Sequence, residues 1–230
     1  MGGQHKAKLH EVELLGQTLT PDGSDMTLIR RGNEYVILAD GKALMSSRMH
    51  GSEEALATFG CERARRLEAP CVLSGGIGMG FSLRAILDVL PREATVVVAE
   101  LLPAIVEWNR EHLGKLAGHP LRDPRVKLAL GDVAVTIGES EDRFDAMLLD
   151  VDNGPTAFAQ ATNSALYGDG GLAAARRALR PKGVYAVWSA WDDVKFEHRL
   201  RHNGFVVDTR RVRARLKGGG PMHTIFLGGL

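Results

Sequence analysis

From Pro70 onward, short runs rich in β-branched residues alternate with runs of helical periodicity, and this alternation constrains the fold more than any other feature. The apolar runs lie at 71–74, 95–100, 125–132, 144–150 and 183–189, and the helical runs between them include 81–90, 103–116 and 172–180. Strands joined through helices of this length form parallel βαβ units with right-handed crossovers. The sequence therefore predicts an α/β fold with a doubly wound, mostly parallel sheet.

The two ends of the chain differ from this pattern. Residues 1–50 contain short β-like runs with Gly32-Asn33 and Asp40-Gly41 as turn dipeptides, which predicts a small antiparallel β domain. A helix is expected over 52–67, with the hydroxyl of Ser52 as its cap. We therefore expect two domains, 1–50 and 51–230. The last two runs, 205–216 and 223–228, are expected to close the sheet as an antiparallel hairpin.

Composition excludes several classes of protein. The 230 residues are 44% hydrophobic and carry a formal net charge of +1, which gives no overall attraction for nucleic acid or an anionic membrane. Neither a membrane span of roughly 18 to 20 apolar residues nor a secretory signal is present, so we expect a cytoplasmic protein. Cys61 and Cys71 are too few for a disulfide framework, and we expect no metal site.

The first strand-to-helix turn of the α/β region is the glycine-rich sequence SGGIGMG, residues 74–80. Ligands of open α/β sheets bind outside the carboxyl ends of the strands, and glycine in this turn allows them to approach the backbone closely. The spacing of Gly76, Gly78 and Gly80 is G-x-G-x-G, whereas the dinucleotide fingerprint places its third glycine one position later, where this chain has Phe81. A dinucleotide ligand is therefore disfavoured.

Two acids follow at the ends of the next strands. Glu100 lies twenty residues after Gly80, a position suited to binding both ribose hydroxyls, and Asp132 ends the strand after it. A nucleoside held by three successive strand ends, without a diphosphate cradle, indicates S-adenosylmethionine. The alternative is that the glycines only form a tight turn and the acids only cap helices.

The chain from about Lys6 to its end resembles the spermidine synthase family and its bacterial methyltransferase-like relatives. The segments that carry the resemblance are LADGKALMSS, SGGIGMG, VVVAEL, LGD, FDAMLLDVDNGP and LYGDGGLAAARRALRPKGV. The resemblance implies a Rossmann-like domain of the class I methyltransferase fold after an N-terminal β domain, and a homodimer. It also implies that the cofactor is bound by Gly75, Gly76, Gly78, Glu100, Leu101, Asp132, Val133 and Asp150.

By the same resemblance, Asp150 is the carboxylate nearest the transferred group, with Asp152 and Asn153 as further catalytic candidates. An amine acceptor arrives protonated near pH 7, and a carboxylate can bind this cation and accept its proton. The segment 154–171 is long and polar enough to form a lid. The candidate residues for binding the acceptor substrate are His50, Glu53, Trp188, Arg215 and His223.

The sequence also departs from spermidine synthases. Their glycine loop normally includes an aspartate that binds the amine of the donor, and Gly78 takes that position here. Their substrate-binding tyrosine is absent from the segment near Ser52 and Glu53. These departures favour a methyltransferase that uses S-adenosylmethionine on a small polar acceptor. The alternatives are a polyamine aminopropyltransferase that uses decarboxylated S-adenosylmethionine, and a noncatalytic nucleoside-binding module.

Overall fold

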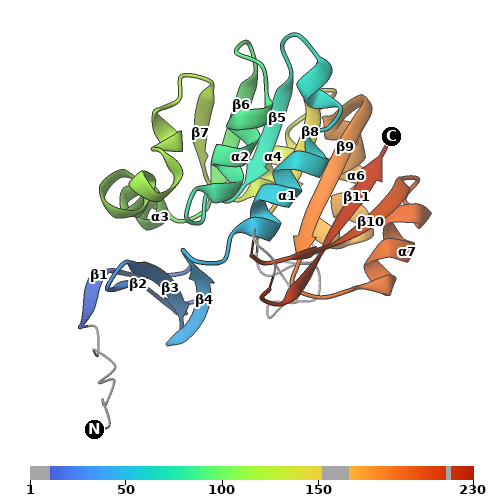
Figure 1. Cartoon of the computed structure of the whole chain (residues 1–230). Helices are drawn as coiled ribbons and strands as arrows, with labels where there is room; N and C mark the ends of the chain where they lie inside the picture. The colour runs from blue at the N-terminus through green and yellow to red at the C-terminus, as the bar shows by residue number, and fades with distance from the viewer. Residues whose placement is uncertain (1–10, 152–165, 216–218) are drawn as a thin grey trace, which may run out of the picture. The chain divides into compact units, whose positions relative to one another are not determined.

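The computed structural model describes residues 11–151, 166–215 and 219–230, and the chain forms two compact units, Met1–Arg48 and Met49–Leu230. The smaller unit is an antiparallel sheet in the order β1-β2-β3-β4 (Figure 1). Leu28 and Ile37 are paired across two of its strands, and both are buried. The strands are β1 (Val12–Leu19), β2 (Asp25–Arg31), β3 (Glu34–Ala39) and β4 (Lys42–Ser46).

The larger unit contains a seven-stranded sheet in the order β10-β11-β9-β8-β5-β6-β7. Its five strands from β5 to β9 are parallel, and β11 is antiparallel to both β9 and β10. The predicted mostly parallel sheet and its closing hairpin are thus confirmed. The strands are β5 (Cys71–Gly75), β6 (Thr95–Glu100), β7 (Val126–Leu130), β8 (Phe144–Leu149), β9 (Leu179–Ser189), β10 (Val206–Arg213) and β11 (Met222–Gly229).

Helices cover both faces of this sheet (Figure 1). On one face α1 packs against α2, and on the other α4 packs against α6, while α7 lies beside β10. Among the described residues, no helix is both long and apolar enough to cross a membrane. The helices are α1 (Gly51–Gly60), α2 (Phe81–Val89), α3 (Pro103–Trp108), α4 (Val133–Gly138), α6 (Asp169–Ala178) and α7 (Val194–His202); short turns are η1 (Ala64–Arg66), η2 (Asn109–Leu113), η3 (Gly114–Ala117) and η4 (Pro120–Arg122).

The core beneath α4, α6 and α7 is rich in aromatic side chains. Phe196 meets Phe226 edge to face at 5.3 Å between ring centroids, and it meets Tyr167 in the same way at 5.5 Å. Burying each such side chain stabilises the fold by about 2 to 3 kcal/mol. This packing fixes the strands whose carboxyl ends form the candidate site.

Three expectations about local structure were wrong. The helix expected over 52–67 ends at Gly60, and its N-cap residue is His50 rather than Ser52. At Gly60 a side chain would lie 2.9 Å from Leu148 Cγ, so the close packing of α1 on β8 requires glycine there. The strand expected over 205–216 ends at Arg213, so Arg215 lies beyond it.

Candidate active site at the carboxyl ends of the strands

The glycines of the turn after β5 adopt backbone conformations in which side chains are strained, and Gly76 also lies close to the end of a neighbouring strand. Gly76 has a φ of +80°, and a Cβ there would lie 3.3 Å from the carbonyl oxygen of Asp150. Gly78 and Gly80 also have positive φ values, of +53° and +88°. L-residues with side chains are strained in this conformation, so the turn leaves its backbone open to a ligand.

The side chain of Asn109, the first residue of the π-helical turn η2, stabilises the glycine turn. Its side-chain amide donates to the carbonyl oxygens of Gly78, at 2.8 Å, and Ile105, at 2.9 Å. Asn109 is buried, and a Cβ on Gly80 would lie 3.0 Å from its Oδ1. This contact could not be predicted from the sequence, because the periodicity of 103–116 predicts an uninterrupted α-helix.

Glu100 ends β6 next to the glycine turn and is almost completely buried. Its two carboxylate oxygens accept backbone N–H groups of Ile77 and Leu102, each at 2.9 Å. Burial raises the pKa of Glu100, while these two hydrogen bonds oppose the rise. Each carboxylate oxygen can accept a further hydrogen bond, so the pair of oxygens remains suited to the two hydroxyls of a ribose.

Asp132 follows β7 and caps α4, where its side chain accepts the backbone N–H of Ala134 at 2.8 Å. The helix-capping alternative therefore applies to this acid, and its adenine-binding role stays a prediction. Two apolar side chains that are about half exposed follow these strand ends, Leu101 (49%) directly after β6 and Val135 (56%) in α4. Because Gly131 N–H donates to Glu100 O at 2.9 Å, these groups lie along one continuous edge. A flat base bound there would cover apolar surface that is otherwise exposed to water.

Two carboxyl groups face each other on the other side of the glycine turn. Asp150 follows β8 and accepts a hydrogen bond from Ser82 Oγ, at 2.8 Å, while Glu53 extends from the first turn of α1. Burial raises the pKa of Asp150, and burial together with the charge of Asp150 raises the pKa of Glu53 to about 8. Neither carboxyl group has an ion-pair partner among the described residues.

Two histidines border this carboxyl pair. His50 stacks on Phe81 with ring centroids 4.0 Å apart, and its Nδ1 lies 2.6 Å from Glu54 Oε1. The substrate-binding tyrosine of spermidine synthases is absent near α1, but this stack provides aromatic surface beside the glycine turn. The imidazole of His223 lies 2.8 Å from Ser52 Oγ.

The structure thus brings together most of the predicted acceptor-binding residues. Trp188 is buried and meets the ring of His223 edge to face at 4.6 Å, and its indole N–H has no hydrogen-bond partner. Arg215 is exposed, and no contact connects it to the carboxyl pair. Asp152 and Asn153 lie outside the described residues, as does most of the segment 154–171, whose described residues 166–171 lead into α6.

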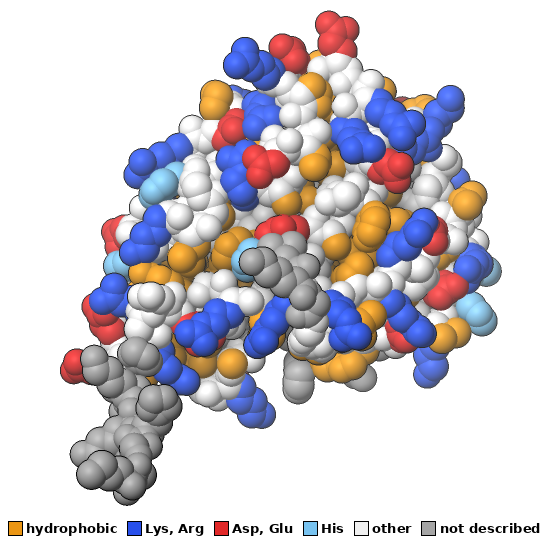
Figure 2. All heavy atoms as spheres, viewed as in Figure 1, with side chains coloured by type: hydrophobic (Ala, Val, Ile, Leu, Met, Phe, Trp, Pro, Cys, Tyr) orange, Lys and Arg blue, Asp and Glu red, His pale blue; other side chains and the backbone are white. Residues whose placement is uncertain are grey.

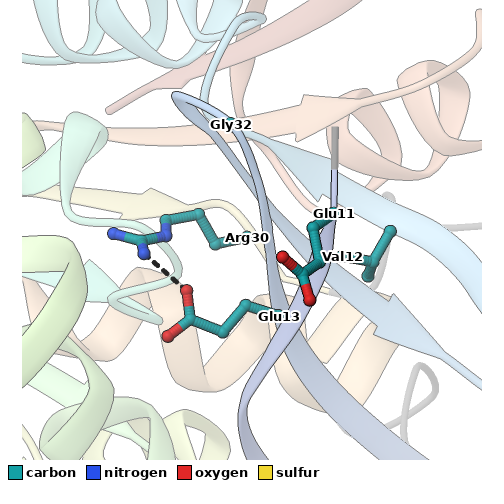
Figure 3. A pocket seen from close by; sticks show the side chains of 5 residues that line it. All are labelled: Glu11, Val12, Glu13, Arg30 and Gly32. Carbon is teal, nitrogen blue, oxygen red and sulfur yellow. Dashed lines mark ion pairs between the residues drawn. The ribbon is translucent and has the colours of Figure 1, made fainter. Parts of the chain in front are cut away.

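Two other features of the described residues bear on the location of the site: the potential metal ligands and a pocket on the smaller unit. The described residues include no cluster of three or more His, Cys, Asp or Glu side chains that could hold a metal ion, and Cys61 and Cys71 are free. The smaller unit has a pocket of about 500 Å³. Figure 3 shows the side chains that line it, which come from β1, β2 and the residues beside them. Its Arg30 is neutralised by Glu13 at 2.5 Å, and the pocket contains none of the glycine-turn or strand-end groups described above.

Comparison with known proteins identifies the family. A family model described as "Spermine/spermidine synthase domain" matches residues 49–204. The chain belongs to the spermine/spermidine synthase family. The resemblance found in the sequence is therefore confirmed.

Two curated relatives of this family member are polyamine aminopropyltransferases. The protein from Korarchaeum cryptofilum is 35% identical over 80 residues, which is 35% of this chain and 24% of that protein. The protein from Nitrosomonas europaea is 34% identical over 97 residues, 42% of this chain and 28% of that protein. The matched segments thus span about a quarter of each relative.

Solved structures of spermidine synthases share the fold of the chain. The enzyme from Thermotoga maritima superposes with a TM-score of 0.72 at 15% identity, covering 94% of this chain and 72% of that chain. A probable spermidine synthase from Corynebacterium glutamicum gives 0.68 at 18% identity, covering 93% and 79%. These structural similarities confirm the α/β fold class predicted for this chain.

Proposed function

We propose that this chain is a polyamine aminopropyltransferase, which uses decarboxylated S-adenosylmethionine to alkylate an amine. The observation that carries the proposal is the pair formed by Glu53 and Asp150, two partly buried carboxyl groups without an ion-pair partner among the described residues. Such a pair is costly unless a cation binds between its members. An alkylammonium group is a suitable cation, and the curated relatives are named for transfer to polyamines.

The chemistry of the proposal follows from these groups. The bound donor supplies a sulfonium, from which the C–S electron pair leaves with sulfur as the nitrogen of the acceptor forms the new C–N bond. The amine must first lose a proton, because alkylammonium groups have pKa values near about 10. Asp150 and Glu53 bind the ammonium and one of them accepts this proton. Orientation of the two reactants accounts for most of the remaining acceleration.

In this proposal the donor lies along the edge formed by the first strand ends. Glu100 binds the ribose hydroxyls, and Leu101, Asp132 and Val133 surround the adenine. The glycine turn, with Gly75, Gly76 and Gly78, holds the methionine-derived tail. His50, Trp188 and His223 border the acceptor. A homodimer and a cytoplasmic location remain predictions.

Methyl transfer from S-adenosylmethionine is the second candidate, and one observation favours it. Gly78 provides no carboxylate in the glycine turn, so the turn offers no partner for the free amine of a decarboxylated donor and no repulsion of a carboxylate tail. None of the relatives and structures named above is described as a methyltransferase. We therefore place methyl transfer second. The noncatalytic nucleoside-binding module is the third possibility.

Calorimetric titration with a diamine, in the presence of the spent nucleoside, tests the carboxyl pair directly. At pH 9, where Glu53 is ionised, we expect the diamine to bind the wild type and to bind Glu53→Gln at least tenfold more weakly, because one of the two carboxylates is lost. Glu54→Gln is the matched control, since Glu54 contacts His50 instead. Equal affinity in the wild type and Glu53→Gln would refute the proposal. Nucleoside binding without turnover of any amine would support the noncatalytic module.

A further inference from the structure

A continuous line of hydrogen bonds leads away from the carboxyl pair. Ser52 Oγ donates to Glu53 Oε2 at 2.6 Å and lies 2.8 Å from His223 Nδ1. Ser52 and Glu53 belong to the first turn of α1, whereas His223 lies 171 residues away in β11. Ser52 is completely buried, while His223 is partly exposed. The line of hydrogen bonds therefore runs from Glu53, through the buried hydroxyl of Ser52, to the imidazole of His223, which contacts solvent.

This arrangement differs from that of a serine nucleophile. In a Ser-His-acid triad the acid orients the imidazole, and the serine contacts the other ring nitrogen. Here the acid contacts the serine, and the serine contacts Nδ1. Ser52 is also inaccessible to any substrate. The three groups are therefore arranged for moving a proton rather than for attacking a carbonyl or ester.

The proposed reaction leaves one proton on the carboxyl pair in every turnover. A protonated carboxyl group cannot deprotonate the next ammonium, so the site needs an exit for that proton. We propose that Ser52 and His223 form a proton relay that returns Glu53 to its ionised form by delivering the proton to solvent. This inference rests on the proposed amine alkylation.

The proton balance of the relay is simple. The acceptor ammonium gives its proton to the Glu53 carboxylate, and Glu53 then passes a proton to Ser52 Oγ as the Ser52 hydroxyl passes its own to His223 Nδ1. The resulting imidazolium releases a proton to water, and the ring returns to its Nε2–H tautomer by exchange with water before the next turnover, so that Nδ1 can accept again. Burial lowers the pKa of His223, which favours this release at neutral pH.

Few other charged groups face His223. Burial is the cause of its lowered pKa, and Arg210 on the neighbouring strand β10 is paired with Asp208 at 2.7 Å. Val212 on β10 is paired with His223 on β11. The ring of Trp188 on β9 meets the ring of His223 edge to face. Within the described residues, Glu53 is thus the titrating group connected to His223 by hydrogen bonds.

The relay is tested first without activity, by following the imidazole signals of isotope-labelled histidine against pH. We expect the His223 signal to move in two steps: its own titration, and a second step near pH 8 when Glu53 ionises. The second step should vanish in Glu53→Gln and persist in Glu54→Gln. A single step that is unchanged in Glu53→Gln would overturn the inference, whether or not the proposed function holds.

Kinetics then separates a relay from a merely structural contact. His223→Ala should lower kcat about tenfold or more in dilute buffer without raising KM for the amine, and added imidazole should restore kcat. His223→Gln, which keeps a hydrogen-bonding group toward Ser52, should show the same loss without rescue. Full activity in His223→Gln, or a loss in His223→Ala that imidazole does not repair, would contradict the relay. Absence of turnover in the wild type would instead remove the proposed function.

Discussion

Replacing Glu53 by glutamine should stabilise the folded protein in alkaline solution. Burial and the charge of Asp150 raise the pKa of Glu53 from 4.5 to about 8, so the folded state keeps this proton long after the unfolded chain has released it. Stability therefore falls as the pH rises from about 4.5 to about 8. Glutamine resembles the neutral form at every pH, so the variant escapes this loss.

The magnitude follows from the shift. One pKa unit corresponds to about 1.4 kcal/mol, so the penalty between pH 5 and pH 9 amounts to about 4 kcal/mol if the group is fully shielded. Glu53 is partly exposed, and solvent screening reduces our expectation to about 2 kcal/mol.

Urea denaturation of both proteins at pH 5 and pH 9 gives the four free energies of unfolding that are needed. The reasoning predicts that Glu53→Gln gains about 2 kcal/mol over the wild type at pH 9 relative to the difference at pH 5. An equal difference at the two pH values, or a variant that loses stability at pH 9, would refute it. Glu54→Gln, which removes a carboxylate paired with His50, should show a much smaller gain, because the charge of Glu54 is the smallest of the causes that raise the pKa of Glu53.

Three further predictions concern the remaining site groups. Glu100→Gln keeps a carbonyl acceptor but loses the charge and one acceptor position for the N–H groups of Ile77 and Leu102, so nucleoside affinity measured by calorimetry should fall at least tenfold; unchanged affinity would remove Glu100 from the ribose site. Asp150→Asn should spare nucleoside binding and lower kcat about a hundredfold, and a fully active variant would exclude Asp150 as a base. Gly78→Asp should raise the affinity for decarboxylated S-adenosylmethionine relative to S-adenosylmethionine, as measured by calorimetry; an unchanged ratio of affinities would show that this position does not contact the donor tail.

The sequence predicted those parts of the molecule that depend on local periodicity. The alternation of strand-like and helical runs after Pro70 predicted the parallel strands. The spacing of Glu100 after the glycine turn predicted that this acid ends the next strand, as it does in β6. Both features follow from short stretches of chain, because a strand's burial pattern and the turn after it are encoded within about ten residues. Asp150 was placed at the end of its strand by the same reasoning.

The parts that were missed depend on contacts between distant residues. Ser52 contacts His223, and His50 stacks on Phe81. Neither contact affects the hydrophobic periodicity or the turn residues of the segments involved. The residues next to Ser52 in the sequence predict that it caps a helix, yet its hydroxyl contacts Glu53 and His223.

The break after α3 has a similar origin. A Cβ at Gly114 would lie 2.3 Å from the carbonyl oxygen of Asn109, and the wider π-helical turn Asn109–Leu113 directly precedes this close approach. The turn directs Asn109 toward the glycine loop. Periodicity alone could not reveal this, because 103–116 has the spacing of an ordinary helix.

Charge on the surface agrees with a small-molecule substrate. Figure 2 shows basic and acidic side chains interspersed over the visible face of the larger unit, without a broad region of one sign. On the edge strand β10, Arg210 and Arg211 are paired with Asp208 and Asp192. Their charges are therefore largely compensated, which argues against a basic track for nucleic acid.

The most direct test of the account is the mass of the product formed when the protein is given both donors together with a diamine. Aminopropyl transfer predicts a diamine heavier by one aminopropyl group, formed only from decarboxylated S-adenosylmethionine. A diamine heavier by one methyl group, formed from S-adenosylmethionine, would contradict this conclusion and make methyl transfer the function.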